Sequence, residues 1–337
     1  MKRSHITVTK RASRLLKMIK QATLLSASGL LLLPALSSCN HKDLCYEHNH
    51  NAEVNLVFDW RNAPDADPSS MAAVMFDRNL TNDPIRFIFT GRDGGKINLP
   101  LGQYDAIGLN ADLNDWANFR NQPDIESVEL YTNDADRLEA YNLMPESVPR
   151  SRGTESERMA STPNMVWSAR TDSIVLDDYD TSKTITIYPE EVVCHYTVTI
   201  LDVENIENAK GEVIDGTLSG MAEGYKFGKH CATDEIVTHP FTLAVDSSGN
   251  VIDGAFLTFG ECPLNKQPHI LTIYLFLSDG SKWYYNFDVT DQVTNAPDPK
   301  HVDIVVRGLS LPRPLQSDAG LHPDVNDWQT ETIDINM

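Results

Sequence analysis

The sequence predicts an all-β protein with two tandem β-sandwich domains behind an amino-terminal signal segment. Apolar and β-branched residues alternate with polar ones in short runs, which is the period of a half-buried strand. Clusters of Gly, Pro, Asp, Asn and Ser separate these runs, and few stretches have helical spacing. Roughly fourteen predicted strands with little helix favour two packed sandwiches.

Residues 1–38 have the pattern of a lipoprotein signal peptide. Seven basic residues and no acidic one lie in this segment, and residues 21–36 are mostly apolar, as secretion requires. Leu36-Ser37-Ser38-Cys39 then places a cysteine after small residues. The apolar run contains Pro34 and falls short of the roughly 20 residues that span a bilayer. We therefore expect cleavage before Cys39 and acylation of that residue, the alternatives being a plain signal peptide or a membrane helix.

The charge of the mature chain limits its partners. Loss of residues 1–38 removes 7 of 28 basic residues and none of the 48 acidic ones, which leaves 299 residues with a net charge of about −27. Such a chain repels nucleic acid phosphates and anionic headgroups. A single acyl chain binds a membrane only marginally. Stable anchoring of this chain therefore needs several acyl chains. We expect no nucleic acid partner and a membrane contact through lipid alone.

Residues 39–52 are expected to form a polar tether. The tether contains several residue types that bind metals, but their spacing matches no zinc pattern, and we expect no metal site. These residues are His41, Cys45, Glu47, His48 and His50.

Residues 53–189 are expected to form the amino-terminal sandwich. Strands are predicted at 54–60, 71–76, 85–90, 96–99, 128–131, 165–170 and 183–189. The glycine-rich turn at 91–95 predicts an antiparallel hairpin between its flanking strands. Pro100 ends a strand because it lacks an amide hydrogen, Gly102 allows a bend, and Tyr104 begins the next strand with a buried ring. One or two helical turns are expected at 133–140 and an exposed loop at 147–156.

Residues 190–312 are expected to form the carboxy-terminal sandwich, with a polar tail at 313–337. Pro189 marks the boundary because it separates two long strands without adding a flexible linker. Hairpins are expected around the turns at 246–250 and 278–281, and the strand at 269–277 is expected to be central. The strand that follows directs one set of side chains to a single face, namely Trp283, Tyr285, Phe287 and Val289.

Four cysteines remain besides Cys39, and they allow three disulfide pairings. Cys194 lies on the apolar face of a predicted strand, where we expect a free core thiol. A disulfide between Cys231 and Cys262 is a candidate pairing in an oxidising compartment.

No motif of catalysis or cofactor binding is present. The sequence lacks a nucleophile elbow, an HExxH helix, a phosphate-binding glycine loop and a CxxC pair. Cys194 and His195 lie on opposite faces of a strand, so they cannot act as nucleophile and base. Glu190 and Glu191 are a carboxylate pair of the kind glycosidases use, but chance pairs are expected among 48 acidic residues. Asp134 and Asp136 could suggest a calcium loop, but their segment lacks the glycine at the sixth position and the glutamate at the twelfth that such a loop has. We expect neither an enzyme nor a cofactor.

Several segments together resemble a Bacteroidales family of fimbrillin-like lipoproteins. The corner Leu99-Pro100-Leu101-Gly102-Gln103-Tyr104 is similar to one repeated in transthyretin-like, Greek-key sandwiches of the fimbrillin superfamily. The other segments that resemble this family are the Cys39 lipobox and residues 58–61, 188–196 and 287–293. The resemblance implies an outer-membrane, palmitate-type lipoprotein of a fimbria: a subunit, tip or anchor that docks to other subunits by strand addition.

A second hypothesis is a glycan-binding surface lipoprotein of a polysaccharide-uptake system. Tryptophans exposed on the surface would stack on sugar rings, whereas tryptophans in the core would not. The five candidates are Trp60, Trp116, Trp167, Trp283 and Trp328.

Overall fold

The computed structural model describes residues 50–79, 83–113, 116–177, 182–247, 249–314 and 327–332. These described residues belong to one compact unit. Nearly all the described elements are strands, which confirms the all-β prediction. The signal peptide, Cys39 and Cys45 lie outside the described residues. No helix among the described residues is long and apolar enough to cross a membrane.

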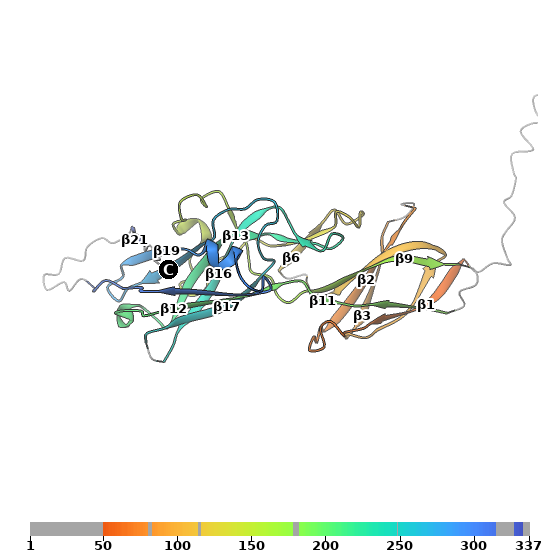
Figure 1. Ribbon diagram of the computed structural model, residues 1–337, viewed down its shortest axis with the longest axis horizontal. Coiled ribbons are helices and arrows are strands. Elements are labelled where there is room, and N and C mark those ends of the chain that lie inside the picture. Colours follow the sequence, from red (N-terminus) through yellow and green to blue (C-terminus); the bar gives the residue numbers. More distant parts are fainter. Residues whose placement is uncertain are drawn as a thin grey trace, which may run out of the picture. The chain divides into compact units, whose positions relative to one another are not determined.

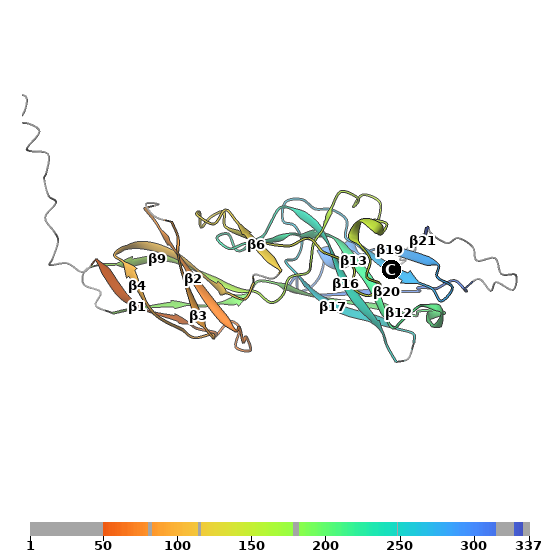
Figure 2. The ribbon, with the colours of Figure 1, turned by 180° about the vertical axis from the view of Figure 1, so that it is seen from behind.

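The first sandwich consists of two sheets with one core between them (Figures 1 and 2). The smaller sheet has the order β10 (Lys183–Ile187), β1 (Asn51–Phe58), β4 (Gly94–Pro100), and β1 pairs with β10 in parallel and with β4 antiparallel. The larger sheet has the order β11 (Glu190–Glu191), β9 (Trp167–Leu176), β5 (Gly102–Asn110), β2 (Ser70–Asp77), β3 (Ile85–Thr90). The alternating apolar side chains of β1, such as Val54 and Leu56, are fully buried between the sheets.

The prediction that β3 and β4 form a hairpin is wrong, because the two strands do not pair with each other. β3 pairs with β2, and β4 pairs with β1 in the opposite sheet. The glycine-rich turn therefore carries the chain from one sheet to the other. Gly94 has φ +98°, and a Cβ there would lie 2.2 Å from the carbonyl oxygen of Leu56. Only glycine tolerates both that dihedral angle and that close approach.

The corner at Pro100 agrees with its prediction. β4 ends at Pro100, β5 begins at Gly102, and the ring of Tyr104 is buried. The Tyr104 hydroxyl donates a hydrogen bond of 3.0 Å to the Pro100 carbonyl oxygen. This bond closes the corner and satisfies the one polar atom of a buried ring.

A nine-stranded sheet, here called the folded sheet, surrounds the largest core (Figure 1). Tyr196 and Ile304 from one end of the sheet share this core with Leu271 and Phe287 from the other, so the sheet folds over on itself. Its strands in order are β20 (His301–Arg307), β12 (Cys194–Leu201), β17 (Ile252–Thr258), β16 (Ile236–Val245), β13 (Val213–Ala222), β18 (Ile270–Phe276), β19 (Lys282–Asp288) and β21 (Trp328–Thr332), with β8 (Arg158–Met159) beside β16.

Both hairpins expected in this part of the chain are confirmed. β16 pairs antiparallel with β17, and β18 pairs antiparallel with β19. β18 lies between β13 and β19, as its apolar sequence indicates. The expected polar tail contains a strand, because β21 pairs in parallel with β19.

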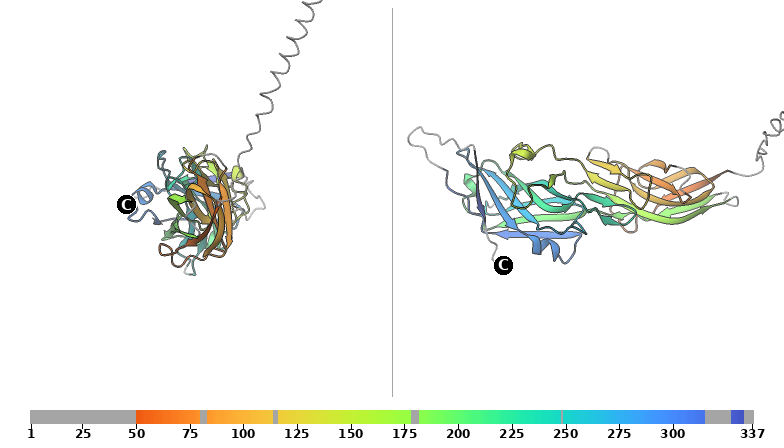
Figure 3. Two further views of the ribbon diagram at one scale, coloured as in Figure 1. Left: turned by 90° about the vertical axis from the view of Figure 1, so that its right-hand side faces the viewer. Right: turned by 90° about the horizontal axis from the view of Figure 1, so that it is seen from above.

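A four-stranded sheet, here called the linking sheet, has the order β15 (Cys231–Ala232), β14 (Gly224–Lys226), β7 (Glu129–Thr132), β6 (Ala117–Arg120). It joins a segment expected in the first domain to strands of the second, and the boundary at Pro189 stays a prediction. Figure 3 shows β6 and β7 in yellow beside the first sandwich, where Leu130 and Phe227 share a core cluster with Ile107.

One local expectation between the sheets is wrong, and another holds in part. The chain at 133–140 is extended rather than helical, with an isolated bridge between Asp134 and Ala160. The loop at 147–156 is exposed at half of its residues, as expected, but the buried residues Val148, Ser151 and Thr154 anchor it. The described helical segments are short, namely η2 (Pro145–Ser147), η3 (Ile206–Asn208) and α2 (Thr290–Thr294).

Candidate functional site

The free edge of β3 is an open sheet edge in the described part of the chain. β3 ends its sheet and pairs only with β2 there. The Gly91 amide donates to the Ser69 carbonyl at 2.9 Å, which fixes the alternation of the antiparallel ladder. By that alternation, the backbone groups of Arg86, Ile88 and Thr90 point away from β2. They form a row of donors and acceptors suited to another strand.

The side chains of β3 leave this edge unprotected. Ile85, Phe87 and Phe89 pack against the core of the first sandwich. The other face carries Ile88, which is 65% exposed. Protein edges are commonly protected by lysines, prolines or bulges, and within β3 only Arg86 is charged.

The edge at β20 provides a contrast. Gln292 in α2 covers it with two hydrogen bonds: its Nε2 donates to the Val305 carbonyl at 3.0 Å, and its Oε1 accepts from the Val305 amide at 2.7 Å. β20 also presents charged side chains, including Asp303 and Arg307. Among the described residues, an incoming strand therefore meets occupied backbone groups at Val305 of β20 and free ones along β3.

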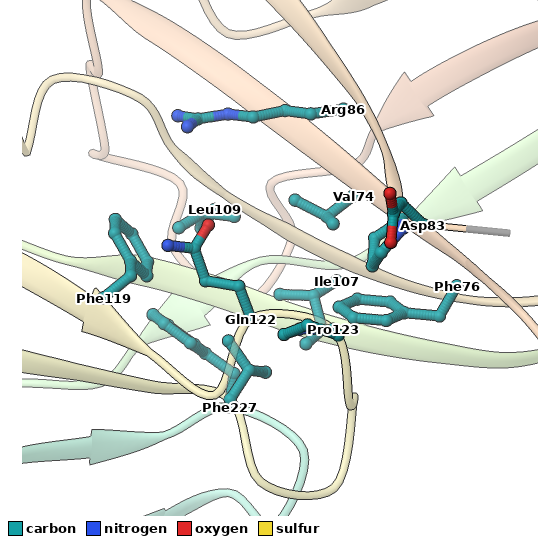
Figure 4. Close-up of a pocket in the computed structure, with 12 residues that line it drawn as sticks. Val74, Phe76, Asp83, Arg86, Ile107, Leu109, Phe119, Gln122, Pro123 and Phe227 are labelled. Carbon is teal, nitrogen blue, oxygen red and sulfur yellow. The ribbon is translucent and has the colours of Figure 1, made fainter. Parts of the chain in front are cut away.

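An apolar cavity of about 210 Å³ lies next to β3, between the outer face of the larger sheet and the linking sheet. We call it the Phe pocket because three phenylalanines line it. Phe76 comes from β2, Phe119 from β6, and Phe227 follows β14 (Figure 4). Phe119 and Phe227 are stacked with ring centroids 6.2 Å apart. Arg86 of β3 also lines the pocket (Figure 4), so the pocket and the β3 edge adjoin.

A buried ionic cluster holds the linking sheet to the folded sheet. The Glu223 side chain is 8% exposed, and its two oxygens lie 2.7 Å from Arg120 Nη2 and 2.9 Å from Arg158 Nη2. Arg120 comes from β6 and Arg158 from β8. Nearby, Arg150 donates to Thr238 Oγ1 at 2.7 Å, which explains why the loop at 147–156 is anchored. Burial raises the pKa of Glu157, whose Oε2 accepts from the same hydroxyl.

The cysteines and histidines are placed for structure. Cys194 is buried, and burial raises the pKa of its thiol, so it is a poor nucleophile. His195 points the other way and stacks on His301 with ring centroids 5.1 Å apart. Burial also lowers the pKa of His239 to about 4. Within the described residues, no group of three or more His, Cys, Asp or Glu side chains could hold a metal ion.

The candidate disulfide is not formed in the structure. Cys231 and Cys262 are both free. The Cys262 thiol instead donates to the Asp234 carbonyl at 3.2 Å, so its hydrogen-bonding capacity is used without a partner cysteine.

The five tryptophans form no open platform for sugars. Trp60 and Trp116 are buried, and the other three are half-buried. The Trp60 Nε1 atom donates to the Arg92 carbonyl at 2.8 Å, and Trp328 packs on Tyr274 with ring centroids 5.5 Å apart. The positions of these side chains therefore indicate packing rather than sugar stacking.

Sequence reasoning missed both the open edge and the Phe pocket. One signal for the edge was available: Ile88 occupies the polar-facing position of an alternating strand. No local signal indicates the pocket, because its walls come from segments about 150 positions apart along the chain, from Val74 to Phe227.

A comparison with a solved structure agrees with this architecture. A candidate adhesin from Bacteroides ovatus ATCC 8483 is 17% identical with a TM-score of 0.58, covering 80% of this chain and 95% of its own. That similarity shows the fold. The fimbrial anchor protein Mfa2 from Porphyromonas gingivalis is 14% identical with a TM-score of 0.45, covering 76% and 89% of the two chains.

The family assignment comes from the sequence. None of the curated proteins matches the chain. The family described as "Domain of unknown function (DUF5119)" matches residues 38–242, which is more than half of the 337 residues. The chain therefore belongs to the DUF5119 family.

Proposed function

We infer that the protein is a structural or adhesive component of a fimbria, as a subunit, tip or anchor, held at the outer membrane by acyl chains on Cys39. The lipobox supports the anchor, and the fold shared with a candidate adhesin supports display at the cell surface. The observation that carries the proposal is the open β3 edge. A neighbouring subunit adds a strand there, because unpaired backbone groups supply affinity to an incoming strand.

Replacement of Cys39 by alanine is expected to abolish the lipid anchor. Wild-type cells fed an alkyne-tagged palmitate should label the mature protein and retain it in the membrane fraction. The Cys39→Ala chain should carry no label, since no other residue follows the small residues of the lipobox. Cys45→Ala is the matched control and should label normally. Equal labelling of the Cys39→Ala chain would remove the anchor from the proposal.

Replacement of Ile88 by lysine is expected to weaken subunit association at least about tenfold, because a charge at an open edge blocks strand pairing and tenfold corresponds to about 1.4 kcal/mol. Assembly is measured as cross-linked multimers on intact cells. The matched control is Val305→Lys, since Val305 is 41% exposed on an edge that Gln292 already covers. Unchanged multimers in the Ile88→Lys strain, or an equal loss with Val305→Lys, would exclude β3 as the docking edge.

A further inference from the structure

The Phe pocket has the size of a site for one ring. Its volume of about 210 Å³ exceeds the roughly 150 Å³ of an apolar protein cavity that takes up benzene. It is smaller than the roughly 300 Å³ or more of sites for drug-sized ligands. Phe76, Ile107 and Phe227 line the pocket and are themselves buried in a core cluster, so a ligand there would contact apolar core side chains.

The floor of the pocket favours an aromatic ligand. Phe119 and Phe227 form a stacked pair on one side, and Phe76 lies across from them (Figure 4). Edge-to-face and offset contacts between rings contribute beyond the burial of area. An inserted ring would meet aromatic faces and edges on two sides, with Ile107 beneath it.

The mouth of the pocket carries an unpaired arginine. Half of the described arginines contact a carboxylate, such as Arg78 with Asp105 and Arg170 with Glu126. Arg86 contacts none, although the chain carries 48 acidic residues. A guanidinium offers a planar pair of donors that matches a carboxylate. Asp83 at the same mouth repels a second negative charge on the ligand.

We propose that the Phe pocket binds a small aromatic monocarboxylate, with its ring among the phenylalanines and its carboxylate on Arg86. The ligand is a free small molecule of about one ring plus a short acid chain. The site goes beyond the proposed fimbrial role and does not depend on it, because binding requires only the isolated protein.

The test titrates the purified, detergent-solubilised protein with sodium phenylacetate and follows binding by saturation-transfer NMR. We expect saturable binding of one molecule per chain. Phenylacetamide has the same shape without the charge, and it should bind at least about tenfold more weakly than phenylacetate. Phenylmalonate carries a second negative charge, which Asp83 repels, and it should also bind at least about tenfold more weakly.

Arg86→Gln should weaken phenylacetate binding at least about tenfold. Arg86 is exposed, so this change should leave the fold intact. Arg152→Gln is the matched control, because Arg152 is also exposed and unpaired among the described residues but lies away from the pocket. A lack of saturable binding, equal affinity for phenylacetamide, or equal affinity in Arg86→Gln would overturn the proposal. Binding only of peptides with an aromatic residue would overturn it in favour of a protein partner.

Discussion

Replacement of Phe287 by alanine should lower the free energy of unfolding by about 4 kcal/mol, the usual cost of truncating a fully buried aromatic ring. Phe287 has no exposed surface and pairs across the ladder with Leu271 in the core of the folded sheet. The loss combines the transfer of apolar surface with the cavity left behind. Urea denaturation followed by tryptophan fluorescence measures the change in midpoint.

Two substitutions define the scale of that effect. Phe287→Leu retains much of the apolar volume and should cost less than half as much. Ile88→Ala removes an exposed side chain and should change stability by less than about 0.5 kcal/mol. Should Phe287→Ala unfold at the wild-type urea concentration, the core described for the folded sheet would be incorrect.

Replacement of Glu223 by alanine should cost about 3 kcal/mol, because it leaves two partly buried guanidinium groups without their shared carboxylate. Arg120 and Arg158 are each only about one-third exposed. Arg120 retains Glu129, which moderates the loss. Since the three side chains come from the linking sheet and the folded sheet, we expect protection from hydrogen exchange to fall first in β6 and β7.

An exposed ion pair is the matched control for the buried one. Lys96 lies 2.7 Å from Glu53, and both side chains are at least half exposed. Glu53→Ala should cost less than about 1 kcal/mol, because solvent screens such pairs. If Glu53→Ala and Glu223→Ala were equally destabilising, burial of the cluster would not be the cause.

The strands around the largest core are predictable from sequence because their alternation is strong. In β12, Cys194, Tyr196 and Val198 alternate with polar residues, and the structure buries that face. Local pattern does not identify the partner of a strand, however. The glycines at 91–95 are equally compatible with a hairpin and with a corner that leads from one sheet to the other. Only the position of Leu56 against Gly94 decides between them.

The segment at 133–140 shows how tertiary contacts override local preference. Ala135 and Leu138 are buried in a small cluster with Tyr274. Extended backbone there pairs with Ala160, a contact that a sequence window does not contain. The Phe pocket is hidden for the same reason, since Val74, Phe119 and Phe227 meet only after all the sheets have formed.

The parallel pairing of β1 with β10 has a mechanical consequence. β1 begins at Asn51, within the last residues of the predicted tether. Five residue pairs, from Val54 with Lys183 to Phe58 with Ile187, join it to β10, which leads toward the folded sheet. Pulling the amino-terminal end of β1 against the far end of β10 slides two parallel strands past each other in shear. Their evenly spaced hydrogen bonds then share the load and break together instead of unzipping one at a time, as a force-bearing joint requires.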